Sequence, residues 1–467
     1  MGIAGTAMAS LAGLLKATGH TVTGSDENVY PPMSHELEAL GIPYQTEFAP
    51  ANLEPRPDVV VVGNAISRGN VELEAVLNRK LRYTSAAAVI KDEFIRGRHS
   101  LAVAGTHGKT SMSSLLAWVL ESAGMNPAFL IGGVAENFGR SFRLTDSKYF
   151  VIEADEYDTA YFDKGPKMWH YLPDTAIVAN IEFDHADIYR DSIAYNFAFA
   201  RFINLIPGNG ALVAGWDSPI VRELAAKSFA PVESFAYADE APVSGGDHPR
   251  WQAKNVSFGP HGTTFTVIHD GAEWGSVQSP LAGAFSVRNI LAVIAAAESV
   301  GADPERVREG LRTYKSVKRR MEVRGEARGV TVIDDFAHHP TAIRETIAAA
   351  RQKYAGRRLV AVYEPRSYTA QLGEFEDAYE AAFAAADEVI LAGLFHPERY
   401  AANALDPARL VERWNKAGKP AAYVPAVPDI VRSLSATTCA GDVVLIMSNG
   451  GFGGLHEKLL QQLKGPA

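Results

Sequence analysis

Short runs of apolar residues recur along the chain, and Ala- and Leu-rich stretches typical of helices lie between them. The runs at 58–62, 100–104 and 443–447 have the length of buried strands. Strands that alternate with helices in this way form parallel sheets covered by helices. The pattern therefore predicts an α/β protein.

The alternation falls into three blocks, covering residues 1–96, 97–318 and 319–467. In the first block we expect a helix to about Ala17 and strands over 21–24 and 58–62. In the second block we expect strands at 100–104, 149–152 and 176–179, helices at 111–122 and 289–299, and antiparallel edge strands within 251–270. In the third block we expect a second doubly wound sheet, with strands at 330–333, 358–363, 388–392, 421–424 and 442–447.

Composition supports a multi-domain globular protein. At roughly 150 residues per domain, 467 residues indicate about three domains. The chain has 45 basic and 54 acidic residues, so nucleic acid is not an expected partner. Its apolar runs are too short to span a membrane, and we see no signal peptide. The single cysteine, Cys439, cannot form an internal disulfide. We expect a cytoplasmic protein, either a monomer or a weak dimer.

The sharpest motif is a glycine loop between a predicted strand and a predicted helix. It consists of Gly105, Thr106, His107, Gly108, Lys109, Thr110 and Ser111. Backbone N–H groups in such a loop bind phosphate oxygens, the lysine reaches the outer phosphates, and the threonine hydroxyl can bind Mg²⁺. Val103 stands where the usual pattern has its first glycine, so this loop is a shorter variant. The motif predicts a nucleotide triphosphate site.

Two further strand ends carry candidate metal ligands. The first is followed by four carboxylates within 153–158, which repel one another unless cations or water screen them. Glu153 comes directly after the apolar run and is the favoured Mg²⁺ ligand, because nucleotide-bound magnesium needs only one or two carboxylates. His185 follows the next strand end and is a second candidate. A solvated acidic loop and a structural histidine are the alternatives.

Both ends of the chain carry weaker signals. Gly2, Gly5 and Asp26 resemble a dinucleotide-binding fingerprint, although the strand that should precede the loop is absent. This fingerprint leaves an NAD(P)-dependent oxidoreductase as an alternative. In the third block, Arg366 could bind a substrate carboxylate or be an ordinary surface arginine. Four glycines within 450–454 suggest close approach of a ligand to the backbone.

These motifs, in this order, resemble the Mur ligase superfamily over essentially the whole chain. The resemblance implies a Rossmann-like N-terminal domain for a UDP-sugar (residues 1–96), a central P-loop ATPase-like domain (97–318) and a Rossmann-like C-terminal domain for the incoming amine (319–467). It also implies ATP-dependent formation of an amide bond through an acyl phosphate. ATP would bind Gly105 to Ser111, and Mg²⁺ would bind Thr110, Glu153 and His185. The residues implied at the adenine, phosphate and ribose are Asn289, Arg320 and Asp335, with Lys109, Glu153 and His185 as the catalytic set.

Within the superfamily, the chain most resembles the branch that joins L-alanyl-γ-D-glutamyl-meso-diaminopimelate to UDP-N-acetylmuramate in cell-wall recycling. The segments that carry this likeness are 28–34, 153–158, 162–164 and 182–187. The sister branch, which adds free L-alanine, has serine at the position of Tyr157 and is the alternative. His338 and His339 match a histidine pair typical of the branch.

Two departures from the superfamily pattern stand out. Phe285 and Ser286 replace a histidine and an asparagine in the motif that ends at Asn289, which changes the expected adenine contact. No lysine lies between His185 and Arg201, so the carbamylated-lysine metal ligand of some members is not expected.

Overall fold

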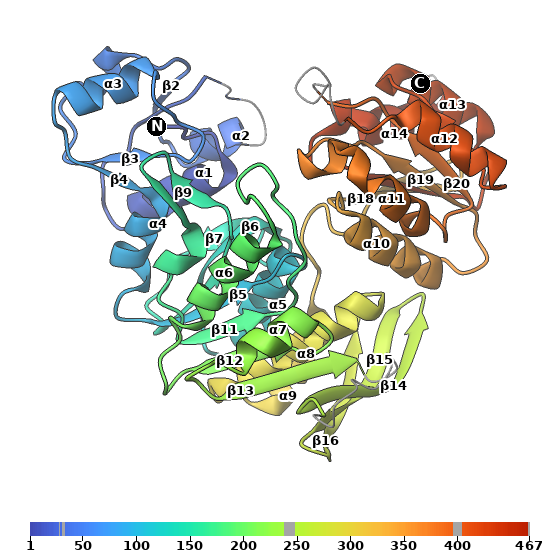
Figure 1. Cartoon of the computed structure of the whole chain (residues 1–467), viewed down its shortest axis with the longest axis horizontal. Coiled ribbons are helices and arrows are strands. Elements are labelled where there is room, and N and C mark those ends of the chain that lie inside the picture. The colour runs from blue at the N-terminus through green and yellow to red at the C-terminus, as the bar shows by residue number, and fades with distance from the viewer. Residues whose placement is uncertain (28, 30–32, 238–247, 396–403, 466–467) are drawn as a thin grey trace.

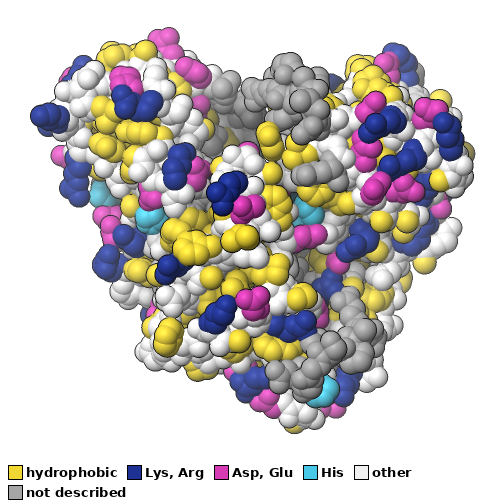
Figure 2. All heavy atoms as spheres, viewed as in Figure 1, with side chains coloured by type: hydrophobic (Ala, Val, Ile, Leu, Met, Phe, Trp, Pro, Cys, Tyr) yellow, Lys and Arg dark blue, Asp and Glu magenta, His cyan; other side chains and the backbone are white. Residues whose placement is uncertain are grey.

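The structure is a computed structural model that describes residues 1–27, 29, 33–237, 248–395 and 404–465. Figure 1 shows three parts: the N-terminal part at the upper left, the C-terminal part at the upper right, and the central part below both. In the same view, Figure 2 shows basic and acidic side chains interspersed over the surface. Among the described residues, no helix combines the length and apolarity needed to cross a bilayer.

The N-terminal part contains short strands and helices. Its elements are α1 (Thr6–Ala17), β1 (Gly24–Ser25), α2 (Met33–Ala39), β2 (Tyr44–Gln45), η1 (Pro50–Leu53), β3 (Val60–Val62), α3 (Val71–Asn78), β4 (Tyr83–Ser85), α4 (Ala86–Val89) and η2 (Ile90–Ile95). β1 pairs in parallel with β2, and β3 with β4. Residues 1–3 lie between the two pairs, because Gly2 N donates to Ser25 O at 2.8 Å and the Met1 ammonium donates to Val61 O at 2.9 Å.

The central part is built on a ten-stranded sheet. Its order is β16-β15-β14-β13-β12-β11-β5-β8-β6-β7, parallel except at the two edges. The strands are β5 (His99–Ala104), β6 (Ala128–Ala135), β7 (Arg140–Arg143), β8 (Tyr149–Glu153), β11 (Thr175–Val178), β12 (Ala211–Gly215), β13 (Val232–Tyr237), β14 (Trp251–Gly259), β15 (Gly262–His269) and β16 (Ala272–Ser279). A separate hairpin holds β9 (Asp158–Ala160) and β10 (Asp163–Pro166). The helices are α5 (Lys109–Ser122), η3 (Lys167–His170), α6 (Ser192–Ile203), α7 (Pro219–Ala225), α8 (Ala284–Ser299) and α9 (Pro304–Thr313).

The C-terminal part has a six-stranded sheet in the order β17-β18-β22-β19-β20-β21. The strands are β17 (Glu322–Ala327), β18 (Val330–Asp335), β19 (Leu359–Tyr363), β20 (Glu388–Leu391), β21 (Ala421–Tyr423) and β22 (Val443–Met447). The helices are α10 (Pro340–Lys353), η4 (Thr369–Gln371), η5 (Gly373–Phe375), α11 (Glu376–Ala382), α12 (Pro407–Lys416), α13 (Val427–Thr437), η7 (Phe452–Gly454) and α14 (Leu455–Lys464). All pairs are parallel except β17–β18, and buried side chains cover both faces of the sheet.

The α/β class and the antiparallel edge within 251–270 are confirmed. The strand expected over 21–24 is wrong in its position: the ladder contains only Gly24 and Ser25, which pair with Tyr44 and Gln45. The preceding residues are largely exposed and lie outside that pairing. Within the segment 28–34, residues 28 and 30–32 lie outside the described residues.

Candidate active site

The glycine loop connects β5 to α5, as its sequence predicts. Gly105 and Gly108 have φ values of 134° and 85°, a region that side chains disfavour. A Cβ atom at Gly108 would lie 3.0 Å from Asn289 Oδ1, so the loop packs directly against α8. Glycine at these positions allows the loop to turn sharply into the N-terminus of α5.

Lys109, the first residue of α5, is buried beside the loop. Its Nζ lies 2.7 Å from Glu156 Oε2 and donates to Gly105 O at 2.8 Å. Burial alone would lower the pKa of Lys109, but the carboxylates of Glu156, Asp155 and Glu153 together outweigh that effect and raise it. Burial alone would raise the pKa of Glu156, but Lys109 and His185 together outweigh that effect and lower it. Both groups are therefore charged at neutral pH.

Glu156 is the centre of a buried network. Its side chain is fully buried, and its Oε1 atom lies 3.1 Å from both His185 Nε2 and the Tyr195 hydroxyl. Tyr195 in turn lies 3.0 Å from Thr106 Oγ1. Glu156 thus joins the glycine loop to the segment that carries His185. The sequence predicted a role for Glu153 but none for Glu156. In the sequence, Glu156 is distinguished only by belonging to the acidic run.

Most carboxylates of the acidic run within 153–158 each form an ion pair with a different lysine. Three of its members each pair with a lysine: Asp155 with Lys167, Glu156 with Lys109 and Asp158 with Lys164. Among the described residues, Glu153 has no lysine or arginine within ion-pair distance. Burial raises the pKa of Glu153 because Lys109, which lies farther away, offsets only part of the desolvation. Glu153 is therefore the carboxylate of the run that lacks a protein cation.

Two donors hold the Glu153 carboxylate at the last position of β8. Thr110 Oγ1 donates to Oε1 at 2.9 Å, and Gly132 N donates to Oε2 at 2.8 Å. The hydroxyl and the carboxylate are both oxygen ligands of the kind Mg²⁺ binds. The structure thus brings Thr110 and Glu153 together, whereas it places His185 against Glu156.

A cavity of about 940 Å³ lies beside the loop, between the central and C-terminal parts. Its wall includes His107, Gly108, Ser111, Asn289, Arg320 and Asp335. Arg320 also donates to Thr110 Oγ1 at 3.4 Å. Both oxygens of Asp335 accept from backbone N–H groups, those of Met321 and Ala337, each at 2.8 Å. A cavity of this size accommodates a nucleotide.

Phe285 and Ser286, the two departures from the superfamily motif, both lie on the wall of this cavity. The Ser286 hydroxyl donates to Ala282 O at 2.7 Å, a backbone contact in the first turn of α8. Ser286 therefore stabilises the turn, while Phe285 adds apolar surface to the cavity.

A second, smaller cavity of about 220 Å³ has His185 on its wall. Its wall includes Tyr157, Asp184, His185 and Asp187 from the central part and Phe336, His338, Ser367, Tyr368, Thr369 and Asn449 from the C-terminal part. The Tyr157 hydroxyl donates to Asp187 Oδ2 at 2.8 Å, and its ring packs edge-on against His185 at 4.5 Å between centroids. The glycine loop therefore lines the larger cavity, and His185, which contacts Glu156, lines the smaller one.

Three domain families match the chain. "Mur ligase family, catalytic domain" matches residues 1–96, "Mur ligase middle domain" residues 103–297 and "Mur ligase, glutamate ligase domain" residues 319–450. The UDP-N-acetylmuramate–L-alanyl-γ-D-glutamyl-meso-2,6-diaminoheptandioate ligase of Escherichia coli (strain K12) is 42% identical over 99% of this chain and 97% of its own. The chain belongs to the Mur ligase family.

Other relatives of this Mur ligase cover comparable lengths. The UDP-N-acetylmuramate–L-alanine ligase of Salinibacter ruber is 32% identical over 99% of this chain and 94% of its own. The crystal structure of a murein peptide ligase from Psychrobacter arcticus is 36% identical, with a TM-score of 0.74 over 100% of this chain and 98% of that one. The L-alanine ligase structure from Thermotoga maritima has a TM-score of 0.81 at 21% identity, over 99% and 97% of the chains, which shows the shared fold.

In the C-terminal part of this Mur ligase, the structure gives the reason for a glycine at position 450. A Cβ atom at Gly450 would lie 2.3 Å from Arg366 Cδ, so the glycine run lets the arginine side chain cross the backbone. The Arg366 guanidinium also lies 3.8 Å from the centroid of the Phe395 ring. The close approach that the glycines predict is therefore, at Gly450, an approach by Arg366.

We expect Gly132→Ala to impair catalysis in this Mur ligase with little loss of stability. The added Cβ atom would lie 2.8 Å from Glu153 Oε2, and the end of a flexible side chain can move away. The carboxylate would then lose its hydrogen bond to Gly132 N and its position beside Thr110. We expect the Mg²⁺ concentration for half-maximal activity to rise about tenfold or more, by analogy with loss of a supporting group at a metal site.

The measurement is a Mg²⁺ titration of ATP-dependent phosphate release, together with thermal unfolding. Gly259→Ala is a control for replacing a strand glycine, because Gly259, like Gly132, has no left-handed φ and no atom lies within 4 Å of a Cβ there. An unchanged Mg²⁺ requirement in Gly132→Ala would show that the position of Glu153 is not important for metal use.

Proposed function

We propose that this Mur ligase joins the tripeptide L-alanyl-γ-D-glutamyl-meso-diaminopimelate to the lactyl carboxylate of UDP-N-acetylmuramate, with conversion of ATP to ADP and phosphate. The observation that carries the proposal is the connection that Lys109 makes between two cavities. Lys109 contacts the glycine loop, which lines the nucleotide-sized cavity, and pairs with Glu156, which contacts His185 on the wall of the smaller cavity. The choice of tripeptide is supported by 42% identity, over 99% of the chain, to ligases with that name in two organisms.

The larger cavity takes ATP, with its phosphates on the glycine loop. Asn289 lies at the loop and Arg320 lies beside Thr110, which supports the proposal that both contact the nucleotide. The Lys109 ammonium binds the outer phosphates in exchange for part of its contact with Glu156. Positive charge at the transferring phosphoryl group is the main contribution that proteins make to this class of reaction.

The oxygen donors at the loop fit Mg²⁺. Thr110 and Glu153 are in contact, and within the described part of the chain Glu153 has no lysine or arginine at ion-pair distance. This is the donor set expected for a nucleotide-bound magnesium ion. We include His185 in the proposed metal site from the family pattern. When bound, the ion would neutralise charge on the outer phosphates.

The reaction proceeds in two steps. A carboxylate oxygen of the sugar attacks the γ-phosphorus, the bond to the β-phosphate oxygen breaks, and ADP and an acyl phosphate result. The free amine of the tripeptide's L-alanine then attacks the acyl carbon, an amide forms, phosphate leaves and the amine loses a proton. The contacts between the central and C-terminal parts limit access of water, which would otherwise hydrolyse the acyl phosphate.

The smaller cavity is the proposed entry site of the amine. It joins His185 and Tyr157 of the central part to His338 and Asn449 of the C-terminal part. Tyr157 stands where the L-alanine-adding branch has serine, so we propose that its ring and its contact with Asp187 shape the site for the longer substrate. The C-terminal domain, residues 319–467, would bind the rest of the peptide.

The test supplies UDP-N-acetylmuramate and ATP with either the tripeptide or free L-alanine, and measures phosphate release and product mass. We expect phosphate release only when all three substrates are present, and a preference for the tripeptide of about 100-fold or more in kcat/KM. A preference for L-alanine would instead assign the chain to the sister reaction. Phosphate release that needs no amine would contradict both.

A further inference from the structure

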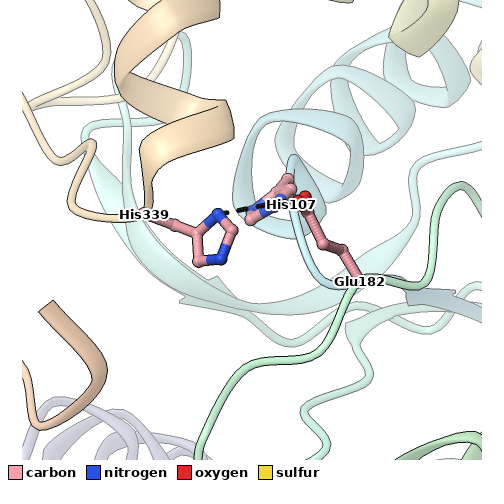
Figure 3. Close-up of side chains that lie close together, drawn as sticks. All are labelled: His107, Glu182 and His339. Carbon is pink, nitrogen blue, oxygen red and sulfur yellow. Dashed lines mark hydrogen bonds and ion pairs between the residues drawn. The ribbon is translucent and has the colours of Figure 1, made fainter. Parts of the chain in front are cut away.

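Three potential metal ligands meet where the central and C-terminal parts touch (Figure 3). His107 comes from the glycine loop, Glu182 from the segment after β11, and His339 from the residue before α10. His107 Nε2 lies 2.9 Å from Glu182 Oε2, and His339 Nδ1 lies 3.9 Å from the same oxygen. All three ligand atoms lie within 4.8 Å of one another.

The spacing suits a tetrahedral ion. Bonds of about 2.0–2.2 Å from zinc to nitrogen and oxygen place tetrahedral ligands roughly 3.4 Å apart. Two of the three separations, 2.9 Å and 3.9 Å, lie on either side of that value, and the third is within 4.8 Å. Side-chain shifts of up to roughly 1 Å would therefore bring the three atoms to tetrahedral spacing. Two imidazoles and one carboxylate are a set that zinc and its neighbours in the first transition row bind, whereas Mg²⁺ prefers oxygen.

The ligands are held by surrounding contacts. Thr341 Oγ1 donates to the other Glu182 oxygen, Oε1, at 2.7 Å, which leaves Oε2 toward the histidines. Asn180 fixes the backbone of His107 on both sides: its Oδ1 accepts from His107 N at 2.8 Å, and its Nδ2 donates to His107 O at 3.1 Å. Support of this kind around the ligands is typical of protein metal sites.

The His339 side chain is buried between the central and C-terminal parts and makes few hydrogen bonds. Its side chain is 5% exposed, its Nε2 atom makes no hydrogen bond among the described residues, and its Nδ1 receives only a 3.3 Å contact from Thr341 N. Burial lowers its pKa to about 4, with a further contribution from His107, so the ring is neutral at physiological pH. Burial alone would raise the pKa of Glu182, but His107, His339 and Thr341 together lower it to about 2. Neutral imidazoles and an ionised carboxylate are the forms that bind metals.

We propose that His107, Glu182 and His339 form a binding site for a divalent transition-metal ion of the zinc class, separate from the magnesium site at Thr110 and Glu153. His107 and Glu182 also line the larger cavity, so a fourth ligand, water or a phosphate oxygen, can reach the ion from there. The ion would join the glycine loop to the start of α10. Its binding would therefore favour the closed arrangement of the two parts and slow each turnover that requires them to separate.

The experiment uses the full-length protein and Co²⁺, whose visible absorption is intense when the ion is tetrahedral with nitrogen ligands. Mg²⁺ is present in excess to occupy the oxygen site, and no nucleotide is added. We expect a saturable tetrahedral spectrum in the unmodified protein, with displacement by Zn²⁺. The variants His339→Gln and Glu182→Gln should bind Co²⁺ at least about 10- to 100-fold more weakly.

Two variants serve as comparisons. His170→Gln removes another histidine that pairs with a carboxylate, Asp163 at 2.9 Å, and should retain the spectrum. Glu153→Gln removes the magnesium carboxylate and should retain it as well. Thermal unfolding without metal identifies any variant that fails to fold, in which case His339→Asn replaces His339→Gln.

Three results would overturn the proposal. They are a spectrum without tetrahedral character, an unchanged Co²⁺ affinity in folded His339→Gln, or loss of the spectrum in Glu153→Gln with its retention in His339→Gln. None of these readouts depends on ligase activity, so failure of the proposed function would be seen separately.

Discussion

Replacing Lys109 with alanine is expected to lower ATP-dependent phosphate release by at least about 10²- to 10³-fold, the loss typical of removing one preorganised charge-stabilising group. The reason is geometric: Lys109 Nζ lies at the glycine loop, where it contacts Gly105 O at 2.8 Å and can reach a bound phosphate. We expect kcat to fall more than the affinity for ATP, because the charge develops in the transition state. Steady-state kinetics with the sugar nucleotide and the tripeptide measure both quantities.

The matched control is Lys227→Ala. Lys227 is 68% exposed and pairs with Glu223 on the surface of the protein, so its loss should leave the rate unchanged. Because Lys109 is buried with Glu156, circular dichroism and thermal unfolding must accompany the kinetics. A folded Lys109→Ala variant with near-normal phosphate release would contradict the assignment of the loop as the phosphate site.

The second large effect is a loss of stability, which we expect in the variant Glu156→Gln. Lys109 and Glu156 have side chains that are 12% and 0% exposed, so removing the carboxylate leaves a buried ammonium without its counter-charge. Loss of one partner of a buried ion pair typically costs about 3–5 kcal/mol. We expect the free energy of unfolding to fall by that order. Urea denaturation at neutral pH measures it.

We expect the loss of stability in Glu156→Gln to become smaller at low pH. Lys109 and His185 lower the pKa of Glu156 below its ordinary value of 4.5, so the ionised form stabilises the folded state. This stabilisation is complete above pH 4.5 and is lost as the pH falls through the lower folded-state value. We therefore expect the difference between the unmodified protein and Glu156→Gln to shrink below pH 4.5, as Glu156 itself becomes neutral.

ATP offers a further check on the same variant. Its phosphates would give Lys109 a new anionic partner, so ATP should raise the midpoint of thermal unfolding more in Glu156→Gln than in the unmodified protein. Glu223→Gln is the control, since Glu223 is 72% exposed and its pair with Lys227 contributes little. Equal stability of Glu156→Gln and the unmodified protein in urea would show that the buried pair is not a stabilising element.

Local patterns predicted the elements that carry the site. The apolar run at 100–104 became β5, and the Gly-Lys-Thr sequence became the start of α5, because a buried parallel strand and a glycine turn both have short-range signatures. The alternation within 251–270 became the antiparallel pair β14 and β15 for the same reason. The strand expected at 21–24 was misplaced, since such a short strand is defined by its partner rather than by its own residues.

The sequence by itself determined the fold class, the glycine loop and the presence of four carboxylates after one strand. Only the tertiary structure decided how each carboxylate is paired. Lys109, Lys167 and Lys164 each neutralise one of them, and no lysine or arginine of the described ranges pairs with Glu153. It also brought His107, Glu182 and His339 together, although 75 and 157 residues separate them in the chain. Contacts over such distances depend on strand order and domain packing, which no local pattern of residues encodes.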